Sequence, residues 1–128
     1  MLIRFFDGAV NQLEQGLAYA NRRHEVLVQN IANLETPGFK AKDLLFEDAL
    51  NPAATAGGLP VPLSRDDRGG RMPRLVQSND SKPTADGNDV NIDRQMARLS
   101  ENTLDHHALV QILSGQFNAL KQAISGRV

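Results

Sequence analysis

The sequence has no cysteine and no tryptophan, and aromatic residues make up only 5% of its 128 residues. The absence of cysteine excludes disulfide bonds, thiolate chemistry and cysteine-ligated zinc, and it leaves the redox compartment open. A hydrophobic content of 41% is also low. The chain is therefore long enough for one ordinary domain, but it has little material for the core of a compact enzyme.

The chain also lacks an excess of charge of either sign. Its formal net charge is −1, and no segment is basic enough to form a nucleic-acid surface. No apolar run is long enough to span a membrane, and the start MLIRFFDGAVNQL has no small-residue cleavage site. We therefore expect no nucleic-acid partner, no direct membrane insertion and no cleaved signal peptide.

What the chain does have is a heptad pattern at each end. In both residues 1–34 and residues 91–128, apolar or semi-apolar positions alternate at spacings of four and three. This pattern predicts two helices, each about 50 Å long at about 1.5 Å per residue. Asn91 or Asp89 can cap the start of the second helix, and Gly126 can end it. The predicted seams are Phe6, Val10, Leu13, Leu17, Ala20, His24, Leu27, Ile31 and Leu34, and then Ile92, Met96, Leu99, Thr103, His106, Val110, Leu113, Phe117, Leu120 and Ile124.

Both seams are weak for a self-sufficient coiled coil. Their middle positions are small or polar, and a glycine inside each helix costs about 1 kcal/mol relative to alanine. Apolar residues beside the seams widen each stripe beyond what one partner helix covers. A self-contained helical hairpin is the simpler interpretation, but these features favour helices that complete their folding by packing against other subunits. The weak positions are Ala20, His24, Thr103, His106, Gly16 and Gly115, and the flanking residues are Phe5, Ala9, Val28, Leu109 and Ile112.

The middle of the chain reads as a connector. Residues 51–90 hold five of the six prolines and five of the ten glycines, which predicts irregular structure. The pieces LPVPL and MPRLVQS could be extended, so at most a small β-hairpin is expected.

The predicted fold is mainly α, with two long terminal helices packed as an elongated coiled-coil-like pair. The heptads do not say whether the helices run parallel or antiparallel. The predicted organisation is an N-terminal helix over 1–34, a joint over 35–50, a connector over 51–90 and a C-terminal helix over 91–128, with the helices forming one structural domain.

Catalytic and metal-binding patterns are scarce. His106 and His107 are adjacent, so on a helix they point about 100° apart, and His24 stands alone. The segment DGNDVNID has the residue types of a calcium loop but lacks its order and its closing glutamate, so a turn leading into a helix cap is the better interpretation. We expect no enzyme activity, no cofactor and no metal.

The stretch NIANLETPGFK, residues 30–40, ends the first helix. Its asparagines and threonine are poor helix-interior residues, because their side chains compete for backbone groups. The proline disfavours the helical region for the residue before it, and Pro37-Gly38 fits the two central positions of a type II turn. We predict a fixed corner that directs Phe39 into an apolar contact. An ordinary stop signal and an export tag are the alternatives.

The same stretch resembles the signature of the bacterial flagellar axial proteins of rod and hook, in which a long N-terminal helix runs into N-x-x-N-x-x-T-x-G-[FY]. Its continuation KAKDLLFEDAL, the short chain and the C-terminal part from DGNDVNID onward are similar to the rod proteins of the proximal rod. The likeness covers both ends of the chain, and the middle matches poorly. The matching positions are Asn30, Asn33, Thr36, Gly38 and Phe39, with Pro37 as a variant between them.

The resemblance implies a mechanical function. Proteins of this family are exported unfolded by the flagellar type III apparatus without a cleaved signal peptide. Their terminal helices pair with both chain ends together and pack into a helical tube around a central channel. The implied role is a subunit of the periplasmic rod in the flagellar basal body, which transmits torque and surrounds the export channel. The implied partners are copies of itself, other rod proteins, and the adaptor and export-gate proteins at the base.

Two other functions stay open from the residues alone. A cytoplasmic coiled-coil adaptor or secretion chaperone would share the heptads but would not need the corner. A metal-dependent enzyme using His24, His106 and a carboxylate is more remote. The residues expected to form interaction surfaces are Leu13, Leu17, Leu27, Ile31, Asn30, Asn33, Thr36, Pro37, Gly38, Phe39, Met96, Leu99, Val110, Leu113, Phe117, Leu120 and Ile124.

Overall fold

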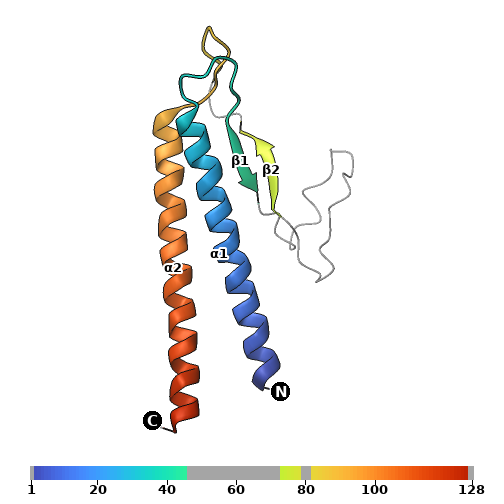
Figure 1. Cartoon of the computed structure of the whole chain (residues 1–128), viewed down its shortest axis with the longest axis vertical. Helices are drawn as coiled ribbons and strands as arrows, with labels where there is room; N and C mark the ends of the chain where they lie inside the picture. The colour runs from blue at the N-terminus through green and yellow to red at the C-terminus, as the bar shows by residue number, and fades with distance from the viewer. Residues whose placement is uncertain (1, 46–72, 79–81, 127–128) are drawn as a thin grey trace.

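The structure, a computed structural model, describes residues 2–45, 73–78 and 82–126. Two long helices lie side by side, and a two-stranded sheet lies against one flank of the pair near one end (Figure 1). The first helix begins and the second ends at the same end of this rod, so the helices are antiparallel. The mainly α fold with a small sheet is confirmed. The elements are α1 (Leu2–Ala32), β1 (Lys42–Leu45), β2 (Arg74–Gln77) and α2 (Ile92–Ser125).

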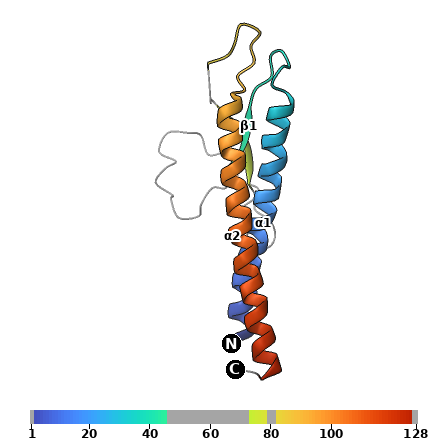
Figure 2. The ribbon, with the colours of Figure 1, turned by 90° about the vertical axis from the view of Figure 1, so that its left-hand side faces the viewer.

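The sheet differs from the predicted hairpin in its first strand. β2 lies within MPRLVQS, as the sequence suggested, and pairs antiparallel with β1, with Lys42 opposite Gln77 and Leu45 opposite Arg74. β1 comes from the joint and was not predicted as a strand. LPVPL lies outside the described residues. Figure 2 shows β1 running along the helix pair, where side chains of α1 bind the backbone of the strand. A strand held in this way needs no alternating pattern of its own.

The ends of the helices follow local chemistry. Asn91 is the N-cap of α2, and its side chain accepts a hydrogen bond from the amide of Arg94 at 3.1 Å. Gly126 ends α2 in the left-handed conformation, with φ of 62°. The N-cap and the glycine at the end of α2 are both confirmed, and of the two candidate caps Asn91 is the N-cap. Asp89 is buried and has a different role.

The buried core lies at the sheet-bearing end of the rod and is largely polar. In the other half, none of the described side chains of residues 8–19 or 103–126 is buried. We call the sheet-bearing end, which has the buried core, the closed end of the rod. We call the other end, where no described side chain is buried, the open end. The buried apolar residues are Ala20, Leu27, Ala41 and Leu44, and the buried polar residues are Asn30, Asp43, Ser78, Asn88, Asp89, Gln95 and Asn102.

The heptad seam predicted for α2 agrees with the contact with α1 at alternate positions, where its residues are half-buried, and is displaced by one residue at most of the others. The fully buried positions are Gln95 and Asn102, which precede the predicted Met96 and Thr103. These amide side chains can be buried because they hydrogen-bond to α1. A prediction that counts only apolar residues leaves out this stabilisation. Leu99, His106, Leu109, Leu113, Gln116 and Leu120 are half-buried, whereas Met96, Val110, Phe117 and Ile124 are exposed.

On α1 the predicted seam agrees better with the structure. Ala20 and Leu27 are buried, and most of the remaining positions are half-buried, although His24 is exposed. The side chain of Phe6 lies outside the described residues. Packing explains why residue 16 is a glycine, because a Cβ at this position would lie 3.2 Å from Cδ1 of Leu109. The absence of a side chain lets the helices approach closely there.

Gly16 of α1 and Gly115 of α2 provide a matched test of this packing. Gly16→Leu should lower the free energy of unfolding by about 1–3 kcal/mol, because the new side chain must displace Leu109. Gly115→Leu should raise it by up to about 1 kcal/mol, because a Cβ there meets no atom within 4 Å and leucine favours helix. Urea denaturation of both variants measures the difference. Equal effects would show that Gly16 is not a close contact.

Candidate functional site

The corner after α1 has the predicted geometry. The amide of Phe39 donates to the carbonyl of Thr36 at 3.3 Å, and Gly38 has φ of 70°. A positive φ at the third residue and a hydrogen bond from the fourth to the first are the features of a type II turn. Pro37 occupies the second position, where its fixed φ suits this turn. The predicted turn is therefore confirmed.

Residues 84–91 lie against this corner and pair with its backbone. The amide of Gly38 donates to the carbonyl of Asp86 at 2.9 Å, and the amide of Asp89 donates to the carbonyl of Phe39 at 3.3 Å. The segment read as a turn before a helix cap is indeed a turn. It is also the partner that keeps the corner in place, which the sequence did not reveal.

Side chains reinforce this pairing. The Nζ atom of Lys40 donates to the carbonyl of Gly87 at 2.9 Å, and the amide of Ala41 donates to Oδ1 of Asp89 at 2.6 Å. Gly87 has φ of 83°, and a Cβ at this position would lie 3.5 Å from Cα of Gly38. The two turns therefore meet at their glycines, and the positive φ of both residues, not a lack of space, is what favours glycine there.

Asn88 completes the end of α1 from a distant part of the chain. Its Nδ2 atom lies 3.0 Å from the carbonyl oxygens of Asn33 and Leu34 and 2.8 Å from that of Thr36. Its Oδ1 atom accepts from the amide of Val90 at 2.8 Å. These carbonyl groups belong to the turn that follows α1, so this buried side chain holds that turn in place. We call the paired segments, residues 33–41 and 84–91, the clasp.

The side chain of Asn30 binds both backbone groups of Lys42 in β1, as a residue of a neighbouring strand would. Its Nδ2 atom donates to the carbonyl of Lys42 at 2.6 Å, and its Oδ1 atom accepts from the amide of the same residue at 3.0 Å. Nδ2 also donates to Oε1 of Gln95 on α2 at 3.0 Å. One buried amide therefore joins α1, β1 and α2. The sequence interpretation of Asn30 as a residue that weakens the helix missed this role.

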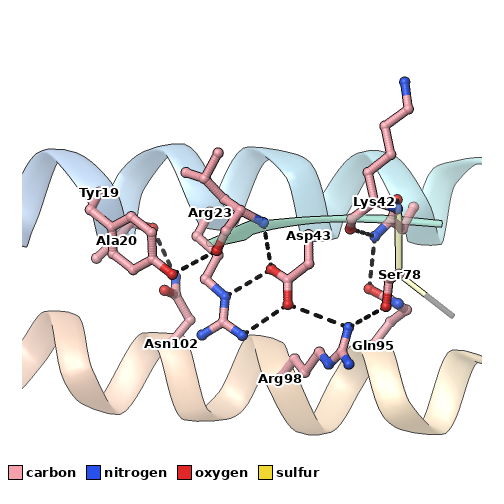
Figure 3. A network of polar contacts seen from close by, with 11 residues as sticks. Tyr19, Ala20, Arg23, Lys42, Asp43, Ser78, Gln95, Arg98 and Asn102 are labelled. Atoms are coloured by element: carbon pink, nitrogen blue, oxygen red, sulfur yellow. Dashed lines mark hydrogen bonds and ion pairs between the residues drawn. The ribbon is translucent and has the colours of Figure 1, made fainter. Parts of the chain in front are cut away.

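The carboxylate of Asp43 lies between two arginines, as Figure 3 shows. Arg23 of α1 approaches it with two nitrogen atoms at 3.0 and 3.1 Å, and Arg98 of α2 lies 3.4 Å from Oδ2. The amide of Leu44 also donates to Oδ1 at 2.7 Å. Arg98 donates in addition to Oγ of Ser78, just after β2, at 2.9 Å. The hydrogen bond to Asp43 raises the pKa of Arg23 above its ordinary value, so the guanidinium is charged at any physiological pH.

The network continues along the helices toward the chain ends. The hydroxyl of Tyr19 donates to the carbonyl of Leu44 at 2.7 Å, and Nδ2 of Asn102 donates to the carbonyl of Ala20 at 2.8 Å (Figure 3). Together with Asn30, Tyr19 satisfies backbone groups on the edge of β1 that faces α1. Every buried side-chain nitrogen and oxygen atom in the described part of the chain has a hydrogen-bond partner.

A cleft of about 210 Å³ lies between the helices just beyond this network and is lined in part by His24 and His106. No group of three or more His, Cys, Asp or Glu side chains that could hold a metal ion occurs among the described residues. Nor does the described part of the chain include a helix of the length and apolar character needed to cross a membrane. The hydrogen bonds and ion pairs of the site join α1, α2, β1 and residues 84–91 to one another.

Comparison with known proteins identifies the family. No family model matches the sequence. The chain is 32% identical to the flagellar basal body rod protein FlgB of Bacillus subtilis over 127 residues, which cover 94% of this chain and 96% of the relative. It is 30% identical to FlgB of Aquifex aeolicus, covering 92% and 94%, and 25% identical to FlgB of Salmonella typhimurium, covering 94% and 95%. The chain belongs to the FlgB family.

Membership of the FlgB family makes this a structural protein of the flagellar basal body rod and not an enzyme. The coiled-coil adaptor, the secretion chaperone and the metal-dependent enzyme receive no support from these relatives. The likeness to FlgB runs over nearly the whole of both chains. It therefore includes the clasp, the sheet and most of both helices.

The structure separates the candidate residues of this FlgB-family chain into three groups. The first group, on the two helices, is buried or half-buried and consists of Leu13, Leu17, Leu27, Ile31, Leu99, Leu113 and Leu120. Asn30, Asn33 and Phe39 are buried or half-buried around the clasp, whose exposed tip consists of Thr36, Pro37 and Gly38. Met96, Val110, Phe117 and Ile124 are exposed on α2. The residues that sequence reasoning missed are Tyr19, Arg23, Asp43, Asn88, Asp89, Gln95, Arg98 and Asn102.

The corner can be tested at Gly38. Gly38→Val should lower the free energy of unfolding by on the order of 1–2 kcal/mol, because a β-branched residue is strained at positive φ. Gly38→Asn should cost less, because asparagine tolerates this region better. No atom lies within 4 Å of a Cβ at this position, so the strain is in the backbone alone. Thermal unfolding of the two variants gives the comparison, and a neutral Gly38→Val would contradict the corner.

The arginine-bound carboxylate can be tested in the same way. Asp43→Ala should lower the free energy of unfolding by about 2–3 kcal/mol, because it removes the carboxylate that two partly buried guanidinium groups share. Asp105→Ala, at an exposed position of α2, is the control and should be nearly neutral. Chemical denaturation of both variants decides the point. Similar small effects would show that the ion pairs are not structural.

Proposed function

We propose that this FlgB-family chain is a subunit of the proximal rod of the flagellar basal body, in the periplasm. Copies of the chain assemble with one another and with other rod proteins into a helical tube. The tube transmits torque and surrounds the channel through which later subunits pass. The flagellar type III apparatus exports the chain without a cleaved signal peptide, and the first subunits contact the adaptor and export-gate proteins at the base.

The observation that carries this proposal is the uneven burial along the rod. The half that bears the clasp has a buried, fully hydrogen-bonded core, whereas the half with the chain ends has none among its described side chains. Large apolar side chains remain uncovered there, with exposed fractions of 70% for Leu104, 54% for Phe117 and 85% for Ile124. Apolar groups exposed at this density mark a contact surface. Neighbouring subunits in a tube would cover them.

The clasp contributes to assembly by fixing shape. Its buried residue Asn88, and Asn30 of α1 beside it, contact other parts of the same chain, so their role in assembly is indirect. They hold the corner that turns the chain from α1 into β1, and thereby keep the sheet on one flank of the helix pair (Figure 1). Thr36 and Pro37, at the exposed tip, remain available to a neighbouring subunit.

Two substitutions on α2 test the function in cells. Phe117→Asp should change the stability of the isolated chain by only about 0.5 kcal/mol, because Phe117 is exposed there. Leu113→Asp should cost about 1–3 kcal/mol, because it brings a carboxylate into the half-buried contact with α1. Both variants should be exported but build no rod.

The measurement is the amount of each variant in the medium and in isolated basal bodies, together with swimming, in a strain that lacks the native gene. Asn11→Asp, which adds the same charge on the exposed face of α1, is the control and should assemble. Intact basal bodies and normal swimming with Phe117→Asp and Leu113→Asp combined would refute a role for this surface.

A further inference from the structure

Four of the weak seam positions come together at the cleft of about 210 Å³ between α1 and α2. Their side chains are small or polar, and no carboxylate, ammonium or guanidinium group is among the described residues that line the cleft. A polar space of this size can hold an ion together with water molecules. The cleft lies where the buried core stops and the open end begins. The residues that line it are Ala20, Asn21, His24, Asn102, Thr103 and His106.

Two of the three histidines of the chain lie on opposite sides of this cleft. Asn102 donates a hydrogen bond to the carbonyl of Ala20, which places these two residues at the same level of the antiparallel pair. His24 comes about one turn after Ala20 and His106 about one turn after Asn102, so they lie on either side of that level. Helical side chains lean toward the N-terminal end of their own helix. The imidazoles of His24 and His106 therefore lean toward each other.

The ring nitrogen atoms of both histidines are open to a ligand. Within residues 2–45, 73–78 and 82–126, neither imidazole takes part in a hydrogen bond or an ion pair. Every buried side-chain nitrogen atom in these ranges has a hydrogen-bond partner, so the ring nitrogen atoms of the half-buried His106 reach solvent. His24 is exposed. His107 contacts His106 edge to face, with 6.2 Å between the ring centroids, but it does not line the cleft.

We propose that His24 and His106 together bind one Zn²⁺ ion, which joins α1 to α2 at the start of the open end. Neutral imidazole is a common ligand for zinc, and the chain has no cysteine to compete for the ion. Water molecules in the cleft complete the coordination. Two protein ligands are fewer than the three of a catalytic zinc site, so the ion acts as a cross-link between the helices. The site lies within one chain and is independent of the rod function.

Zinc titration of the purified, metal-free full chain tests the site. Isothermal titration calorimetry measures the number of ions bound, and thermal unfolding with ZnCl₂ or MgCl₂ measures the stabilisation. His24→Gln and His106→Gln each remove one imidazole and keep a polar side chain. His107→Gln is the matched control, because it removes the neighbouring imidazole that does not line the cleft. Circular dichroism without metal compares the folding of the variants.

The unmodified chain should bind one Zn²⁺. Its melting temperature should rise by about 5–10 °C when free zinc is about 100 times the dissociation constant, and MgCl₂ should leave it unchanged. The rise should disappear in His24→Gln and His106→Gln and persist in His107→Gln. Zinc should also slow hydrogen exchange of the α1 amides in residues 10–19, because the cross-link holds the open end together, and this effect should be absent in His24→Gln.

Three results would overturn the proposal. One is a melting temperature of the unmodified chain that does not respond to zinc, and another is an equal loss of the response in His107→Gln. The third is a response that survives in all the variants, which would mean adventitious binding only. His24 is exposed, so His24→Gln decides the point even if His106→Gln does not fold. None of these results touches the rod function, which is judged from basal bodies and swimming.

Discussion

The closed end of the molecule depends on the ion pairs that the carboxylate of Asp43 makes with Arg23 and Arg98. Two helices alone cannot bury much surface, and here the space beside them is filled by a short strand. That strand carries a charge inward, which would be costly without partners. Arg23 and Arg98 approach the carboxylate from the two helices, so the charge that makes the strand difficult to bury also joins both helices to it. Because both arginines are held by one acceptor, the separation of the helices is fixed at this level.

Other polar groups also bind the backbone of β1 and of the segments next to it. Asn30 and Tyr19 occupy the edge of β1 that faces α1, and β2 occupies the other edge. Asn88 binds the carbonyl groups of the turn that follows α1. The result is a small core that is held by directional hydrogen bonds more than by apolar area. Such a core specifies one geometry, since each buried donor and acceptor requires its own partner.

This difference between the two halves of the rod has a functional meaning in the FlgB family. The closed end has one defined geometry, set by its hydrogen bonds and ion pairs. The open end exposes apolar side chains of α2 that no described residue of the chain covers. In the proposed rod, the closed end fixes the shape of the subunit and the open end provides its contact surface. The division also explains why the signature around Pro37 and Gly38 is best understood as part of the subunit's own structure, with only its tip free.

The sequence by itself determined the two helices, their caps at Asn91 and Gly126, and the turn at Pro37 and Gly38, because periodicity, capping and positive φ are local properties. Through its resemblance it also indicated the family. Only the tertiary structure decided which face of α2 meets α1, because Gln95 and Asn102 are buried through hydrogen bonds to residues far away in the chain. The same holds for β1 and for the pairing of residues 84–91 with the corner. Hydrophobic patterns rank residues by apolar character, whereas a polar core is selected by the geometry of its partners, which exists only once the chain has folded.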